Sequence, residues 1–356
     1  MSEIAVKAVN ISKKFQNIVA LDKVSLTINK GEYAAIIGPS GSGKSTLLKC
    51  IIGLETPDSG DIIIFNRKVN DLPPEERGVG LIFQEIALFP HMSVRGNVAY
   101  AAFLRQPGNL EKIIRETLSA LNMELRAKSL PRELSLGEQQ KVAIARALAS
   151  GARLLLMDEP YGSMDPKTAA TLRHEVRSLA KSLGLTVIHV THNQEEAMAV
   201  ADKVAVMRKG RIEQVGTPLE LYLKPKTLFV ARFVGGENNF IECKAVGRNG
   251  SSVILEVNSA IVKAAGEIEH GDVILVVRPE KLRFDREGIL SGIVETREFL
   301  GKLYKYVIKM KHGGRLVVKA PERVDIGVTV RLSFKPEDAI VFPMPAEGLA
   351  EAIKYE

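Results

Sequence analysis

One segment of this 356-residue chain limits the fold more than any other, the run Gly38-Pro-Ser-Gly-Ser-Gly-Lys-Ser45. It fits the pattern G-x-x-x-x-G-K-[ST] and stands between an apolar run, residues 34–37, and a helix-like segment, residues 46–52. Glycines let the backbone wrap closely, so that successive N–H groups point at one anion, and the following helix adds its positive end. The sequence therefore predicts a strand, a phosphate-binding loop and a helix, in that order.

Each residue of this loop is a candidate contact for a nucleoside triphosphate. Lys44 is expected to neutralise the β- and γ-phosphates, and the Ser45 hydroxyl to take a place on Mg²⁺. The simpler alternative is a turn rich in glycine and serine, which the strand–loop–helix context disfavours. The predicted nucleotide-binding residues of this segment are Gly38, Pro39, Ser40, Gly41, Ser42, Gly43, Lys44, Ser45 and Thr46.

A second apolar run, residues 153–157, ends in the adjacent carboxylates Asp158 and Glu159. At the end of a strand, Asp158 is expected to reach Mg²⁺. Because successive side chains of a strand alternate, Glu159 is expected to point elsewhere and to act as general base toward the attacking water. A solvated start of a loop is the alternative, and the phosphate loop upstream favours the catalytic interpretation.

The pattern of apolar residues changes once along the chain. Up to about residue 235, short apolar runs such as 34–37, 153–157 and 186–190 alternate with helical segments such as 109–122, which predicts an α/β domain with a largely parallel sheet. After Gly235-Gly236, strictly alternating runs predict a small all-β barrel of the OB kind. The predicted domains are residues 1–235 and 236–356.

Composition excludes few functions. The net charge is +7, and the surplus lies before residue 236, but the basic residues are scattered and aromatic residues are few. A surface that handles phosphates or lies near an anionic membrane explains this as well as nucleic acid does. The two cysteines lie far apart, which does not support a disulfide framework. No apolar run reaches membrane length and no signal peptide is recognised, so we expect a cytosolic protein.

The run at residues 134–148, Leu-Ser-Leu-Gly-Glu-Gln-Gln-Lys-Val-Ala-Ile-Ala-Arg-Ala-Leu, opens with Ser135 and Glu138 at the spacing of a capping box, which predicts the start of a helix. The run resembles the LSGGQ signature of ABC-transporter ATP-binding subunits, with Leu136 where the first glycine is expected. The resemblance extends from about residue 5 to 233 and implies a P-loop NTPase fold, with a RecA-like core and a helical subdomain. It also implies that Ser135, Gly137 and Glu138 face the ATP held by a second copy.

Further positions follow from the same resemblance. Phe15 and Val19 stand where an aromatic and a neighbouring residue contact adenine, and residues 162–165 where a loop crosses the dimer interface. Gln84 matches the residue that links metal and nucleophile to the transmembrane partner, and His192 the histidine that contacts the γ-phosphate. The implied catalytic set is Glu159, His192, Lys44 and Gln84, and the implied metal set is Ser45, Gln84 and Asp158.

The tail narrows the resemblance to importers. Val277-Arg-Pro-Glu280 and the β-rich run 238–342 resemble the accessory domain of importer ATPases that serve sugars, polyamines, ferric iron or oxyanions. This implies Mg²⁺-dependent ATP hydrolysis by a homodimer that sandwiches two ATP molecules. It also implies separate permease subunits, an extracytoplasmic solute-binding protein, and a peripheral position on the cytoplasmic face of the membrane, with no nucleic-acid partner expected.

Three alternatives stay open at this point. A soluble ABC-type ATPase acting on nucleic acid or ribosomes usually carries long coiled-coil inserts or two cassettes, and neither is seen in the sequence. A P-loop kinase has no need for the run at 134–148. A regulatory protein with a degenerate nucleotide site is disfavoured because the site residues are intact, namely Lys44, Asp158, Glu159 and His192.

Overall fold

The computed structural model describes residues 3–105, 107–250, 252–257, 260–311 and 313–355. Met1 and Ser2, which entered the prediction that no signal peptide is present, lie outside this part of the chain. The chain divides into two compact units, one up to Leu221 and one from Tyr222 to Tyr355. The division comes before the predicted boundary near 235 because α8 (Leu228–Phe233) packs with the strands of the second unit.

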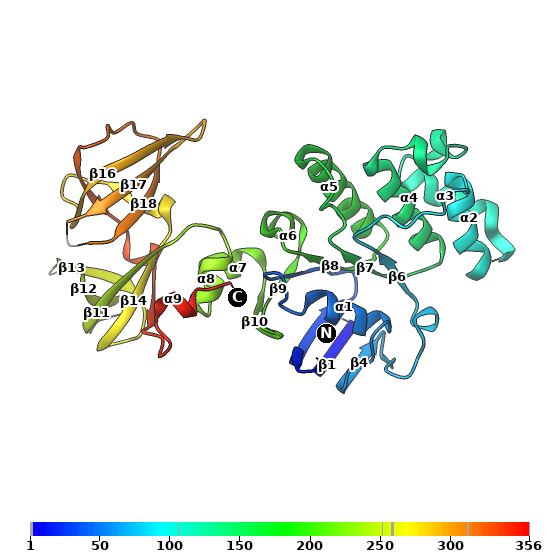
Figure 1. Ribbon diagram of the computed structural model, residues 1–356, viewed down its shortest axis with the longest axis horizontal. Helices are drawn as coiled ribbons and strands as arrows, with labels where there is room; N and C mark the ends of the chain where they lie inside the picture. Colours follow the sequence, from blue (N-terminus) through cyan, green and yellow to red (C-terminus); the bar gives the residue numbers. More distant parts are fainter. Residues whose placement is uncertain (1–2, 106, 251, 258–259, 312, 356) are drawn as a thin grey trace. The chain divides into compact units, whose positions relative to one another are not determined.

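A six-stranded sheet forms the centre of the first unit, in the order β10-β9-β3-β8-β7-β6 (Figure 1). Its strands run parallel except β10, which is antiparallel to β9. The runs predicted as strands correspond to β3, β7 and β8, so the prediction of a largely parallel sheet is confirmed. The strands are β3 (Tyr33–Ile37), β6 (Val79–Ile82), β7 (Leu154–Asp158), β8 (Thr186–Thr191), β9 (Lys203–Arg208) and β10 (Arg211–Gly216).

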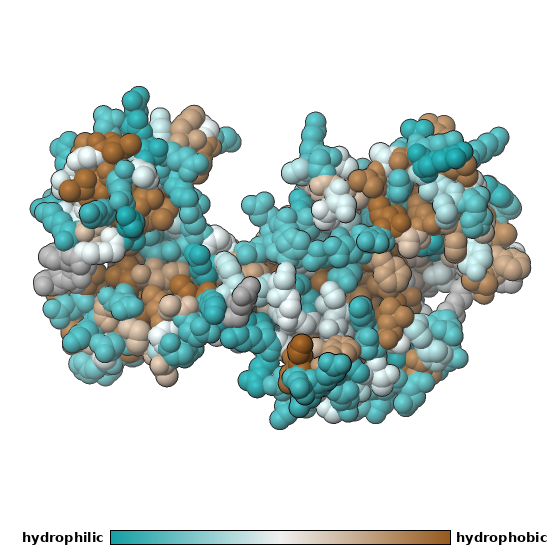
Figure 2. Space-filling model, in the orientation of Figure 1, coloured by the Kyte–Doolittle hydropathy of each residue, from teal (hydrophilic) through white to brown (hydrophobic). Residues whose placement is uncertain are grey.

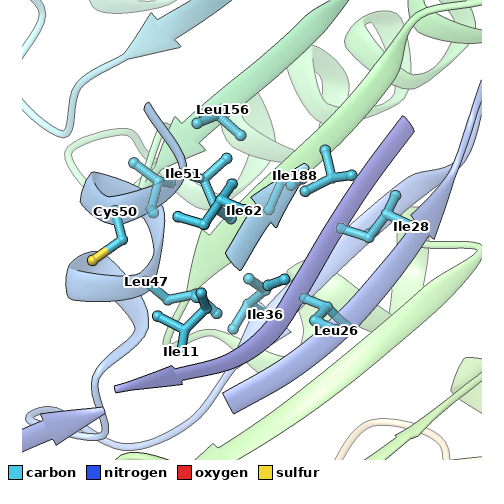
Figure 3. Close-up of a cluster of buried hydrophobic side chains, with 14 of the residues drawn as sticks. Ile11, Leu26, Ile28, Ile36, Leu47, Cys50, Ile51, Ile62, Leu156 and Ile188 are labelled. Carbon is cyan, nitrogen blue, oxygen red and sulfur yellow. The ribbon is translucent and has the colours of Figure 1, made fainter. Parts of the chain in front are cut away.

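A second, antiparallel sheet in the order β2-β1-β4-β5 was not predicted from the sequence. Its strands are β1 (Ile4–Phe15), β2 (Ile18–Asn29), β4 (Ser59–Ile64) and β5 (Arg67–Lys68). Helix α1 (Lys44–Ile52), predicted to follow the phosphate loop, packs with both sheets in one core. Figure 3 shows Ile11 of β1, Leu47 of α1 and Ile188 of β8 in this cluster. Full burial of each such side chain contributes roughly 1.5–3 kcal/mol, which fixes the loop between strand and helix.

Helices cover the rest of the first unit. The predicted helix at 109–122 is α3 (Leu110–Ala120), which buries Ile114 and Leu118 and packs with α2 (Val94–Arg105) and α4 (Leu136–Ala149). Figure 1 shows α5 (Pro166–Ser182) and α6 (Gln194–Val200) across the parallel sheet from α1. The short α7 (Pro218–Leu223) follows β10. Among the described residues, no helix has the length and apolar character that a membrane crossing requires.

The second unit is built from two sheets. A closed barrel has the order β11-β12-β13-β20-β14, and a five-stranded sheet has the order β15-β19-β16-β17-β18. The predicted all-β character is confirmed, while the prediction of a single barrel omitted the second sheet. One core joins the two, with Leu275 and Tyr306 fully buried. The strands are β11 (Asn239–Asn249), β12 (Ser252–Val257), β13 (Ala260–Ala265), β14 (Gly271–Val277), β15 (Arg283–Phe284), β16 (Leu290–Phe299), β17 (Tyr304–Met310), β18 (Arg315–Ala320), β19 (Thr329–Ser333) and β20 (Ala339–Pro343), and α9 (Leu349–Ala352) follows them.

Candidate nucleotide site

The phosphate loop has a backbone that only glycine fits at two of its positions. Gly43 has φ 99°, and a Cβ there would lie 2.3 Å from the carbonyl oxygen of Ala20. A Cβ on Gly38 would lie 2.3 Å from the carbonyl oxygen of Met207. Any side chain would force the loop away from β2 and β9, so the glycines of the motif are required by the packing around the loop as well as by its turn.

Lys44 lies over the loop that precedes it. Its Nζ donates to the carbonyl oxygens of Gly38 at 2.9 Å and Pro39 at 2.8 Å, and the residue is buried. Burial lowers the pKa of Lys44, and the nearby carboxylates of Glu159 and Asp158 oppose that shift. A partly desolvated ammonium group held over this glycine-rich loop is suited to a polyanionic phosphate.

Ser45 and Asp158 meet across the start of α1 and the end of β7. The Ser45 hydroxyl donates to Asp158 Oδ1 at 3.1 Å. Burial raises the pKa of Asp158, and the Ser45 hydrogen bond opposes the shift. Hydroxyl and carboxylate oxygens are the ligands that Mg²⁺ prefers, and this ion usually keeps several waters and substrate phosphates. The pair therefore fits Mg²⁺, although the described residues contain no cluster of three or more His, Cys, Asp or Glu side chains able to hold a metal.

The backbone conformation of Glu159 differs from the one predicted, in which Glu159 continued the alternation of the strand. Strand β7 ends at Asp158, and Glu159 has φ 44°, a left-handed conformation rare for this residue type. Its backbone N–H donates to the carbonyl of Val190 at 2.9 Å. The side chain is thus aimed by a strained backbone held by β8, and not by the alternation of a strand. Such outliers concentrate at functional sites.

Two of the other predicted catalytic side chains, His192 and Gln84, contact that carboxylate. His192 Nδ1 lies 2.9 Å from Glu159 Oε1, and Gln84 Nε2 lies 3.5 Å from Oε2. His192 follows β8 and Gln84 follows β6, so both come from carboxyl ends of the parallel sheet. Ligand sites of open α/β sheets lie at this edge.

Phe15 and Val19 flank the turn between β1 and β2. Both are exposed, at 41% and 44%, and Lys13 Nζ lies 5.3 Å from the centre of the Phe15 ring. Residue 20, next along β2, abuts Gly43 of the phosphate loop. Phe15 pairs with Ile18 at the start of β2, so this turn leads into the strand that contacts the phosphate loop.

The predicted capping box at Ser135 is confirmed. Ser135 Oγ accepts from the Glu138 N–H at 3.3 Å, and Glu138 Oε2 accepts from the Ser135 N–H at 2.9 Å. Leu136 is the first residue of α4, has no left-handed backbone and is 47% exposed, so leucine fits there without strain. These residues lie at the start of α4, and within the described part of the chain no hydrogen bond or ion pair joins them to the phosphate loop.

One contributor to the site was missed by sequence reasoning. Glu196 of α6 is buried, and its carboxylate accepts a hydrogen bond from the Thr191 hydroxyl at 3.0 Å, beside His192. A signal for it exists: Asn193 followed by Glu196 has the spacing of a capping box, and Asn193 Oδ1 accepts from the Glu196 N–H at 3.2 Å.

Comparison with known proteins identifies the family. A family model described as "ABC transporter" matches residues 21–162, and one described as "TOBE domain" matches residues 275–342. The chain is 38% identical over 348 residues to the spermidine/putrescine import ATP-binding protein PotA of Bacillus thuringiensis (strain Al Hakam), covering 94% of this chain and 98% of that protein. This chain belongs to the ATP-binding subunits of ABC transporters.

Other members support the assignment. PotA of Oleidesulfovibrio alaskensis is 40% identical to this ABC ATPase over 304 residues, which cover 84% of this chain and 81% of that protein. A solved dimeric ATP-binding cassette in a post-hydrolysis state with ADP and phosphate matches with a TM-score of 0.54 and 34% identity, over 60% of this chain and 98% of that one. CbiO1 of Clostridium perfringens, part of an ABC transporter complex, matches with a TM-score of 0.59 and 27% identity, over 65% and 95%.

These findings confirm the importer-type ABC ATPase predicted from the sequence. The protein binds and hydrolyses ATP, it works with membrane permease subunits, and its fold is a P-loop NTPase followed by an OB-like domain. They give no support to an ATPase that acts on nucleic acid or ribosomes.

Proposed function

We propose that this ABC ATPase powers the uptake of a polyamine, by ATP-driven closure of a homodimer on the cytoplasmic face of the membrane. In this proposal residues 1–235 form the ATP-binding domain and residues 236–356 the accessory domain. A solute-binding protein outside the membrane delivers the substrate to the permease. The similarity to polyamine import ATP-binding proteins along nearly their whole length carries the choice of substrate.

The proposed roles in hydrolysis follow the geometry of the site. Phe15 and Val19 contact adenine, and residues 38–46 contact the phosphates. Ser45, Asp158 and Gln84 hold Mg²⁺, which neutralises charge on the phosphates when bound. Glu159 accepts the proton of the attacking water, and His192 and Gln84 hold its carboxylate, a geometry supported by their distances of 2.9 and 3.5 Å. Ser135, Gly137 and Glu138 approach the γ-phosphate held by the second copy.

A groove beside the residues after Gln84 is the proposed docking site for a permease helix. It has a volume of about 450 Å³, and its walls come from β6, the 84–94 loop, α2 and α4. Phe89 and Tyr100 pack edge to face at 4.9 Å, and Arg146 lies 5.3 Å from the centre of the Phe89 ring. Figure 2 shows apolar side chains gathered around this region. An amphipathic helix fits a groove of this composition.

Uptake into proteoliposomes tests the substrate. The full chain is assembled with candidate permease subunits and a candidate solute-binding protein from its own organism. Uptake of labelled spermidine, putrescine, ferric iron, sulfate and maltose is then measured with internal Mg-ATP. We expect polyamine uptake that is lost in K44A, because the phosphates lose their cation. Transport of another solute, with no polyamine uptake, would overturn the choice of substrate while leaving the ATPase intact.

A further inference from the structure

A buried carboxylate lies under the turn that carries His192. Glu196 is 6% exposed, although glutamate is among the residue types least often buried without a partner. Its Oε2 accepts from the Thr191 hydroxyl at 3.0 Å, and its Oε1 accepts from Asn193 Nδ2 at 3.4 Å. Glu196 therefore contacts the residues on both sides of His192.

The turn itself is closed by a second set of hydrogen bonds. The Asn193 N–H donates to the Thr191 hydroxyl oxygen at 2.9 Å, and the Glu196 N–H donates to Asn193 Oδ1 at 3.2 Å. The His192 side chain is 60% exposed, so packing does little to hold it. Its position against Glu159 is instead set by the backbone turn, and the turn by Glu196.

Two basic side chains face this carboxylate from other elements. Arg173 of α5 places a guanidinium nitrogen 3.9 Å from Glu196 Oε1, and His189 Nε2 lies 3.9 Å from Oε2. His189 is fully buried between the rings of Tyr33 and Tyr161, and burial lowers its pKa to about 3, so its imidazole is neutral. Arg173 is therefore the cation paired with Glu196; it is half-buried and comes from the helix that follows residues 162–165.

We propose that Glu196 is a positioning residue for ATP hydrolysis, which holds the 191–193 turn so that His192 meets Glu159. Arg173 anchors the carboxylate from α5. The inference rests on the proposed role of His192. Truncating Glu196 removes the acceptor of Thr191 and leaves Arg173 without its partner, so the turn shifts. Displacing a catalytic group by about 1 Å can cost roughly 100-fold in rate. Among the described residues, no hydrogen bond or ion pair joins Glu196 to the phosphate loop, so we expect nucleotide affinity to be spared.

Steady-state hydrolysis by the full chain tests the proposal, with kcat and KM for ATP measured for E196A, E196Q, H192A and H192A/E196A. We expect E196A to lower kcat by roughly 10- to 100-fold with little change in KM. E196Q keeps an acceptor oxygen for the Thr191 hydroxyl and should therefore retain most of the kcat that E196A loses. The matched control is E195Q, which changes the exposed carboxylate next in the same helical turn and should match the wild type.

The H192A/E196A variant distinguishes a positioning role of Glu196 from a general loss of structure. If Glu196 acts through His192, E196A causes no further loss in single-turnover rate once His192 is alanine. The His192 imidazole resonances should shift in E196A and stay in place in E195Q. The proposal would be overturned if E196A lowered the single-turnover rate equally in the wild type and in H192A, or if E196A had the wild-type kcat. Hydrolysis by H192A at the wild-type rate would instead overturn the proposed role of His192, on which this inference rests. Should E196A fail to fold, R173K, which weakens the ion pair to Glu196, carries the same cycle with H192A, and a loss from R173K that persists once His192 is alanine would overturn the proposal.

Discussion

Glu159 is the residue on which the neighbouring groups of the site converge. Its backbone is left-handed at φ 44°, and its carboxylate lies within 2.9 Å of His192 Nδ1 and 3.5 Å of Gln84 Nε2. A strained backbone that the surrounding structure holds in place fixes the direction of this side chain before substrate arrives. The site is therefore arranged to keep one carboxylate in a set position next to the phosphate loop.

Replacing this carboxylate should separate binding from hydrolysis. E159Q keeps the shape and the contacts to His192 and Gln84 but cannot accept a proton, so we expect hydrolysis to fall roughly 100-fold or more while ATP binding is retained. Single-turnover hydrolysis and equilibrium binding of a fluorescent ATP analogue measure the two effects. E116Q, on the exposed face of α3, is the control and should match the wild type. Cleavage by E159Q at the wild-type rate would remove Glu159 as the general base.

The sequence predicted the site residues that belong to local motifs. Lys44, Ser45 and Asp158 are defined by spacing to an adjacent strand or helix, and the structure brings them together. The direction of Glu159 was attributed to the wrong cause, because a left-handed residue leaves no mark on the pattern of apolar residues. Glu196 was missed because its role depends on α5 and β8, which a single sequence does not pair with α6.

At the scale of elements, α4 shows how a local motif sets a helix start. Ser135 and Glu138 satisfy each other's backbone N–H groups, so the first turn of α4 is capped without help from another element. The structure therefore agrees with the sequence where the signal lies within four residues. The antiparallel sheet joins two hairpins, β1–β2 and β4–β5, through the pairing of β1 with β4 about 50 residues later in the sequence, and local patterns do not reach that pairing.

This cap should contribute to stability in a pH-dependent way. S135A is expected to destabilise the protein by about 1 kcal/mol, the usual cost of a lost N-cap. The N–H of Ser135 lowers the pKa of Glu138, so the stabilisation by the Glu138 carboxylate is present above its ordinary pKa and is lost as pH falls. E138Q should therefore lower the melting temperature at pH 7 and match the wild type at low pH. A gap between E138Q and the wild type that persists at low pH would contradict the capping role, and E116Q, in an exposed ion pair on α3, serves as control.

At the scale of the whole molecule, the proposed homodimer would explain why the predicted site residues lie in two separate places. Lys44, Asp158, Glu159 and His192 gather at the carboxyl ends of the parallel sheet. Ser135 and Gly137 lie at the start of α4, and in the described part of the chain no hydrogen bond or ion pair joins either of them to those four residues. The N-terminus of a helix readily binds an anion, and the first residue of α4, Leu136, is exposed. Two copies related by a twofold axis would place each such terminus over the other's ATP.

The dimer can be tested with a variant that keeps the helix and opposes the phosphate. In E159Q with Mg-ATP, sedimentation should show a species of twice the monomer mass, which reverts with ADP because the γ-phosphate that joins the halves is absent. Adding L136E should abolish this species. Glutamate at the first position of a helix is favoured by the helix dipole, so α4 stays folded, while its charge repels the triphosphate of the second copy. ATP binding by the E159Q/L136E monomer should be unchanged, which shows that the loss lies in pairing. If E159Q/L136E pairs as tightly as E159Q, the N-terminus of α4 does not face the nucleotide of the second copy.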